Sequence, residues 1–69
     1  MTRGDVVRVF PANNDDPEAV AHTGEQFSVE RTRITQGGTL LVTVGAPTPA
    51  NPFAVRIFRE CDLLKVEGN

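Results

Sequence analysis

The sequence predicts an all-β fold: a small, partly closed barrel of five short strands, with one short helical turn in the first long loop. Two observations lead to this prediction. Runs rich in β-branched residues alternate between apolar and polar side chains with a period of two. Glycine and proline cluster between these runs, where turns need them. The chain has 69 residues, so we expect a single domain over residues 1–69.

The first strand is expected over residues 6–10, which are dense in valine and are followed by a proline. The next segment, residues 12–22, is polar and rich in turn-forming residues. Asp16 can cap a short helix there, because Pro17 suits the first helical position. A helical turn is therefore predicted over residues 17–21, although it is too short to be stable alone.

A second strand is predicted after residues 23–24 and ends near Ile34. Val29 and Ile34 are an odd number of residues apart, so strict alternation would place them on opposite faces of the sheet. We therefore expect an irregularity within this strand. A glycine-rich hairpin turn over residues 36–38 leads into the third strand, residues 39–44.

Residues 45–52 contain three prolines, which exclude a central strand and predict an extended loop. The fourth strand is expected over residues 53–59. A single 3₁₀ turn over residues 60–62 then leads into a last short strand, in which Leu63 and Val66 are expected to be buried.

The predicted core consists of the inward positions of the five strands. These positions are Val7, Val9, Phe27, Val29, Leu40, Val42, Val55, Ile57, Leu63 and Val66. In the fourth strand, this choice also directs Phe53 inward and leaves Phe58 on the outer face.

Two strands carry the same pattern on the outer face: Arg8 and Phe10 in the first, Arg56 and Phe58 in the fourth. An exposed phenylalanine forgoes about 1.5–3 kcal/mol of burial, so we expect something to cover it. Three covers are considered. The phenylalanines close the open ends of the barrel, they meet another copy or another protein, or they line a ligand pocket.

Charge and composition disfavour several functions. A net charge of −2 and a pI near 5.2 argue against a general nucleic-acid binder, and the chain has no Trp or Tyr to stack on bases. His22 and Cys61 are the only residues of their types, so neither a disulfide within the chain nor a zinc knuckle is expected. We expect no catalytic residue, no cofactor and no metal.

Asp15, Asp16 and Glu18 lack the spacing of a calcium loop and are interpreted as a solvated, helix-capping turn. Gly37 and Gly38 are not followed by the lysine and helix of a phosphate-binding loop. No apolar run approaches the ~18 residues needed to cross a bilayer, and the first residues lack the apolar core of a signal peptide. A soluble, cytoplasmic protein is expected, in agreement with the single cysteine.

The order of these elements resembles the SH3-like barrel family. The resemblance covers nearly the whole chain and rests on Gly4-Asp5-x-Val7-Arg8, Thr23-Gly24, Gly38-Thr39-Leu40, and Val55-x-Ile57 followed by Leu63-x-x-Val66. It implies a fold and not one function, because ribosomal KOW modules and photosystem accessory subunits share such features.

The segment Val55-Arg56-Ile57-Phe58 is similar to the end of the type II dihydrofolate reductases, which are SH3-like barrels that form tetramers around a central active-site pore. Their signature at this place is Val-Gln-Ile-Tyr, so Arg56 replaces the glutamine, Phe58 replaces the tyrosine and Ile57 is kept. Val9 stands near the place of a lysine that the family uses. The resemblance implies a related shape and a related edge for self-association.

The sequence therefore predicts a non-catalytic protein-binding or assembly module that self-associates. Its binding face is expected to consist of Arg8, Phe10, Arg56, Phe58 and Arg59, with residues 12–22 and 45–52 beside it. Two alternatives stay open: an oligomeric enzyme similar to the type II dihydrofolate reductases, and a nucleic-acid-binding barrel similar to KOW modules.

Overall fold

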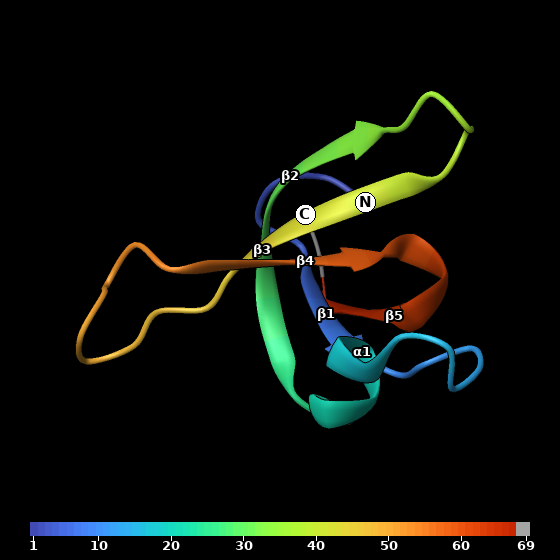
Figure 1. Cartoon of the computed structure of the whole chain (residues 1–69). Coiled ribbons are helices and arrows are strands. Elements are labelled where there is room, and N and C mark those ends of the chain that lie inside the picture. Colours follow the sequence, from blue (N-terminus) through green and yellow to red (C-terminus); the bar gives the residue numbers. More distant parts are fainter. Residues whose placement is uncertain (68–69) are drawn as a thin grey trace.

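The computed structural model describes residues 1–67 and contains five antiparallel strands in one sheet, which confirms the all-β prediction. The strands are β1 (Val6–Val9), β2 (Gln26–Ile34), β3 (Leu40–Gly45), β4 (Val55–Arg59) and β5 (Leu63–Glu67). A short helix, α1 (Pro17–Ala21), follows β1, and a 3₁₀ turn, η1 (Glu60–Asp62), joins β4 to β5 (Figure 1). The strand order is β4-β3-β2-β1-β5, so the curved sheet is not closed and β4 and β5 are its edges.

The helix α1 begins as the sequence predicts. The carboxylate of Asp16 accepts a hydrogen bond from the backbone N–H of Glu18 at 3.1 Å, and Pro17 occupies the first helical position. The hydroxyl of Thr23 donates to the carbonyl of Val20 at 2.8 Å, just beyond the end of the helix. Ala19 is fully buried, so packing against the core stabilises a helix that is too short to form alone.

The expected irregularity in β2 is a β-bulge at Glu30. Val29 pairs with Val44 and Arg31 pairs with Thr43, so Glu30 is an extra residue without a partner in β3. Val29 and Val44 are buried in the core. The bulge therefore directs Arg31 to the face of the sheet that lies away from the core.

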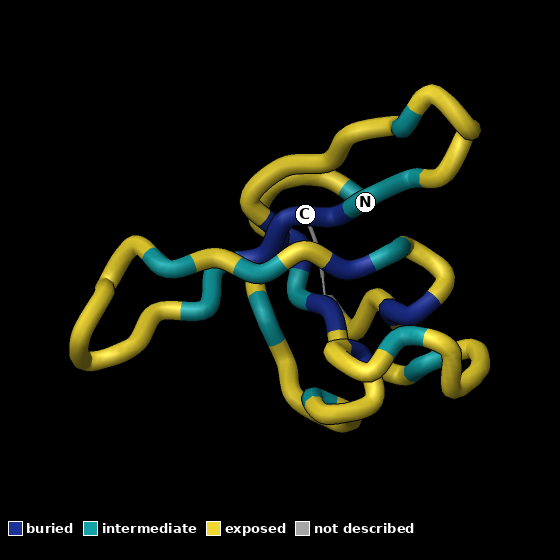
Figure 2. The backbone as a smooth tube through the Cα atoms, viewed as in Figure 1, coloured by how far each residue is buried: buried dark blue, intermediate teal, exposed yellow. Residues whose placement is uncertain are grey.

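The buried residues lie mainly in the strands, with Ala19 of α1 joining them, and the buried stretches of chain come together at the centre of the molecule (Figure 2). Its buried apolar residues are Val7, Val9, Ala19, Val29, Val42, Val44, Phe58 and Leu63. The predictions for Val7, Val9, Val29, Val42 and Leu63 are confirmed, whereas Phe27 and Leu40 are only half-buried.

The predicted register of β4 is wrong. Phe58 is 1% exposed, whereas Val55 and Ile57 are 49% and 52% exposed and Phe53 is 88% exposed. Phe58 pairs with Val42, whose side chain faces the core, and residues opposite each other in a sheet share a face. Its ring packs against that of Phe27, with 5.7 Å between the centroids. One aromatic ring fills the centre of this small core better than two aliphatic side chains at its edge would.

The prediction that Val66 is buried is also wrong, since its side chain is 47% exposed. Leu63 pairs with Val9 and shares its buried face. Val6 pairs with Glu67 and Val7 pairs with Lys65, so Val66 is an extra residue at a register shift and has no partner in β1.

Candidate functional site

The structure does not bring the five predicted binding residues together on one face. Phe58 lies in the core, whereas Phe10 is 66% exposed just after β1. Arg8 is exposed on β1 and pairs with Leu64 of β5. Arg56 forms an ion pair with Glu18 of α1. Of the two phenylalanines in the repeated pattern, only Phe58 therefore joins the core. Of its two arginines, Arg56 is held by an ion pair within the chain.

Arg59 ties the loop before α1 to η1. Its Nε atom donates to Asp62 Oδ2 at 2.9 Å, and its Nη2 atom donates to Asp15 Oδ1 at 2.5 Å. The carboxylate of Asp62 is fully buried and also accepts from the backbone N–H of Ala12 at 3.1 Å. Hydrogen bonds from Arg59 lower the pKa of Asp15, and the two carboxylates raise the pKa of Arg59. Arg59 therefore stabilises the fold by connecting Asp15 and Asp62.

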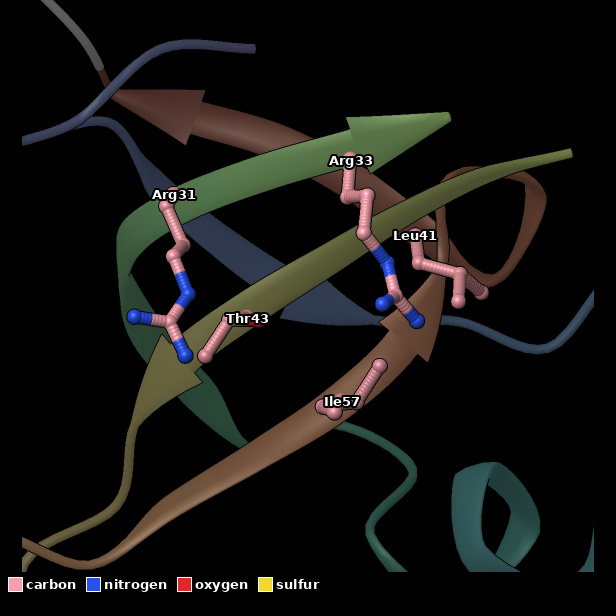
Figure 3. Close-up of a pocket in the computed structure, with 5 residues that line it drawn as sticks. All are labelled: Arg31, Arg33, Leu41, Thr43 and Ile57. Carbon is pink, nitrogen blue, oxygen red and sulfur yellow. The ribbon is translucent and has the colours of Figure 1, made fainter. Parts of the chain in front are cut away.

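A different set of residues forms a hollow on the outer face, the side of β2, β3 and β4 away from the core. Arg31 and Arg33 of β2, Leu41 and Thr43 of β3 and Ile57 of β4 line this arginine hollow, which has a volume of about 120 Å³ (Figure 3). Arg31 pairs with Thr43, and Thr43 pairs with Ile57, so one residue of each strand lies in one row across the face.

The guanidinium groups of Arg31 and Arg33 have no carboxylate within ion-pair distance among the side chains of residues 1–66. Both side chains extend over β3 toward β4, and the guanidinium of Arg33 reaches the space between Leu41 and Ile57 (Figure 3). An unpaired arginine beside exposed apolar side chains is suited to bind a carboxylate or a phosphate through two parallel hydrogen bonds.

A second hollow lies on the outer face beside the first, where β4 begins. Glu30, Gly45, Val55, Ala54 and Phe53, with two prolines of the β3–β4 loop, line this apolar hollow, which has a volume of about 370 Å³. Gly45 leaves room for the side chain of Glu30, since a methyl group at this position would lie 3.1 Å from Glu30 Oε1. The carboxylate of Glu30 therefore makes this end of the face negative, whereas the end near Arg31 and Arg33 is positive.

Both hollows border β4, which has a strand neighbour on one side only. Among residues 1–67, β4 pairs with β3 and with no other strand. The other side of an edge strand presents backbone N–H and C=O groups that can pair with a further strand. The apolar Val55 and Ile57 are exposed at alternate positions of this edge.

A third hollow, of about 340 Å³, lies near α1 and includes His22, Glu25, Phe27 and Arg56. His22 Nδ1 is 2.7 Å from Glu25 Oε2, and the imidazole contacts the rings of Phe27 and Phe58 edge-on. Arg56 is held by Glu18 in the same region. His22 therefore lies between Glu25 and the two rings and packs against the core residue Phe58.

The remaining candidates serve the fold. Asp16 caps α1, while Asp15 and Glu18 form ion pairs with Arg59 and Arg56. Over residues 1–67, no group of three or more His, Cys, Asp or Glu side chains is placed to hold a metal ion. In the same part of the chain, no helix has the length and apolar character that crossing a membrane requires.

The sequence reasoning missed Arg31 and Arg33 as site residues. Their direction depends on the bulge at Glu30, which changes the face of every later residue in β2. The odd separation of Val29 and Ile34 indicated an irregularity in this strand but not its position, so it did not place the two arginines on the outer face.

Comparisons with known proteins do not identify a family. No family model matches the chain, and neither curated proteins nor solved structures contain a match.

Proposed function

We propose that this chain is a non-catalytic protein-binding module whose partner docks on the outer face of β2, β3 and β4 and along the free edge of β4. One observation carries the proposal: the unpaired Arg31 and Arg33 lie beside exposed apolar residues on a strand with a free edge. Arginine and exposed apolar side chains are typical of interface centres, and an edge strand supplies backbone hydrogen bonds to a partner.

The topology supports the resemblance to SH3-like barrels, which we keep as part of the proposal. The strand order β4-β3-β2-β1-β5 and the 3₁₀ turn between β4 and β5 agree with the element order on which that resemblance rests. A fold of this kind carries many functions, so the function is argued from the outer face alone. We place the module in the cytoplasm, where the exposed thiol of Cys61 would stay reduced.

The contacts of β4 do not favour the reductase-like alternative. Phe58, which replaces the tyrosine of the reductase signature, is buried, and Arg56, which replaces the glutamine, is paired with Glu18. Of the four residues at the place of that signature, only Val55 and Ile57 are exposed.

Charge favours a different protein over a second copy of this chain. Pairing two copies edge to edge about Ile57 would extend one sheet and place four unpaired arginines on the same outer face. Asp15 and Glu18 are engaged with Arg59 and Arg56 of their own chain, so they are not free to neutralise Arg31 and Arg33 of a neighbour. Glu30 lies on the outer face, but the four arginines of such a pair would outnumber its two Glu30 carboxylates. Like charges brought together at an interface oppose association.

A selection of displayed random peptides on the purified protein tests the proposal. We expect enriched peptides to lose about tenfold or more in affinity for Ile57→Thr, because an apolar anchor is lost while the β-branched shape is kept. Leu64→Thr is the matched control, since Leu64 is 58% exposed on the opposite edge strand, β5. No enrichment, or peptides that depend on Leu64 and not on Ile57, would overturn the proposal.

A further inference from the structure

The two hollows of the outer face occur at alternate residues of one edge strand. Ile57 lines the arginine hollow and Val55 lines the apolar hollow. Residues two apart in a strand are about 6.6–6.8 Å apart and point to the same face. An extended segment paired with β4 would therefore place its own alternate side chains over the two hollows, one in each.

We propose that the partner is an extended segment that adds to β4 as an antiparallel strand and carries an acidic residue two positions before an apolar residue. This inference rests on the proposed function and specifies the chemistry of the partner that the outer face binds.

The arginine hollow selects the acidic residue. A carboxylate placed opposite Ile57 would meet the guanidinium of Arg33, which already reaches that strand, with Arg31 and the hydroxyl of Thr43 beside it (Figure 3). Neither arginine would have to give up another ion pair to bind it. Hydrogen bonds between a guanidinium and a carboxylate are among the strongest in proteins.

The apolar hollow selects the second residue. Phe53 and Val55 are 88% and 49% exposed there, so an apolar side chain would remove their surfaces from water. The carboxylate of Glu30 lies across Gly45 in the same hollow and would repel a second acidic residue. The arginine hollow thus prefers an acidic side chain, and the apolar hollow prefers an apolar one.

The order of the two residues follows from the direction of the strands. Along β4, Val55 precedes Ile57. An antiparallel partner passes Ile57 first and Val55 second, so its acidic residue precedes its apolar residue. Antiparallel pairing is the commoner arrangement and is the one that every strand pair of this sheet uses.

A designed peptide tests this order. The acidic peptide is acetyl-Thr-Glu-Thr-Glu-Thr-Leu-Thr-amide, the reversed peptide has the same residues in opposite order, and the neutral peptide has Gln in place of Glu. We expect NMR titration of the full chain to give a dissociation constant at least about tenfold lower for the acidic peptide than for the other two. Equal binding of the three peptides at Ile57 would overturn the inference but leave the proposed function standing.

Protein variants locate the carboxylate. Arg33→Gln should weaken the acidic peptide about tenfold or more and leave the neutral peptide unchanged. Arg8→Gln removes the same charge from β1, outside both hollows, and should change neither affinity. Equal losses in the two variants would mean that only overall charge matters and would overturn the inference.

Backbone methylation distinguishes strand addition from a peptide lying across the face. In an antiparallel strand, alternate residues point both of their backbone polar groups toward the same neighbour. We compare two forms of the acidic peptide, one N-methylated at its Thr residues and the other at its Glu and Leu residues. One form should lose binding, and the other should keep it. Equal effects would contradict pairing with β4, and tighter binding of a ten-nucleotide oligothymidylate than of the acidic peptide would assign the arginines to phosphate instead.

Discussion

At the scale of residues, neighbouring side chains of β4 have opposite tasks. Phe58 is fully buried at the centre of the core, whereas Ile57 is exposed on the outer face. Alternation alone could not decide which of the two faces is buried, because the strand offers Val55 and Ile57 on one side and one large ring on the other. The pairing of Phe58 with Val42 of β3 determines which face is buried, and this pairing register cannot be read from the sequence.

The first prediction compares these two residues. Phe58→Ala should lower the free energy of unfolding by about 3–5 kcal/mol, because it leaves a cavity in a small core. That loss is close to the whole stability of a domain of this size. Ile57→Thr should change the free energy by less than about 1 kcal/mol, since its side chain is half exposed. Chemical denaturation measures both, and a larger loss for Ile57→Thr would contradict the register of β4.

The second prediction concerns Asp15. Its pKa is lowered from the ordinary value of 3.8, mainly by hydrogen bonds from Arg59. A carboxylate whose pKa is lower in the folded protein stabilises the fold above its unfolded pKa, and this contribution is lost as the pH falls through the folded pKa.

Thermal unfolding of the wild type and of Asp15→Asn as a function of pH tests the contribution of the Asp15 carboxylate to stability. The wild type should have the higher Tm at neutral pH, and the difference should shrink as the pH falls below 3.8. A difference in Tm that does not depend on pH would show that the ion pair with Arg59 does not contribute.

At the scale of elements, the two long connections differ in their attachment. The sequence predicts high mobility for both residues 12–22 and residues 45–52, because both are polar or rich in proline. In the structure, the first connection is tied down by buried Ala19 and by ion pairs of Asp15 and Glu18 with β4. The β3–β4 loop is mostly exposed and is closed by hydrogen bonds between Thr48 and Asn51.

The third prediction follows from this difference. In amide hydrogen exchange, residues 18–23 should exchange more slowly than residues 47–53, because opening α1 exposes buried Ala19 and breaks the ion pair of Glu18 with Arg56. Equal exchange rates in the two segments would mean that these ion pairs do not order the first connection.

The bulge in β2 shows which features of a strand can be predicted from the sequence and which cannot. The odd separation of Val29 and Ile34 predicts an irregularity, and the structure confirms it at Glu30. The pattern could not fix the position of the extra residue, since a bulge at any residue between the two restores the alternation. That position decides where Arg31 points, so the arginine hollow could not be predicted with the strand.

At the scale of the whole molecule, the strand content, the short helix, the β2–β3 hairpin and the 3₁₀ turn were predictable from local patterns. These features depend on residues near each other in sequence, such as the cap at Asp16 and the glycines of the β2–β3 turn. The binding face depends on which strands become edges and how they pair, and these are properties of the assembled sheet.

The fourth prediction concerns the assembly state. Light scattering on the purified chain should give the mass of a monomer, 7.5 kDa, because the unpaired arginines of two copies would meet on one face. A dimer that dissociates on Ile57→Thr would contradict this and would establish the self-association that the sequence predicts.

The most direct test of the docking site is amide hydrogen exchange of β4 with and without the acidic peptide. If the peptide adds to the edge, alternate amides of Val55–Arg59 gain protection on binding, and the amides of β5, the opposite edge, do not change. Protection that appears in β5, or binding that leaves every β4 amide unchanged, would contradict the claim that the free edge of β4 receives the partner.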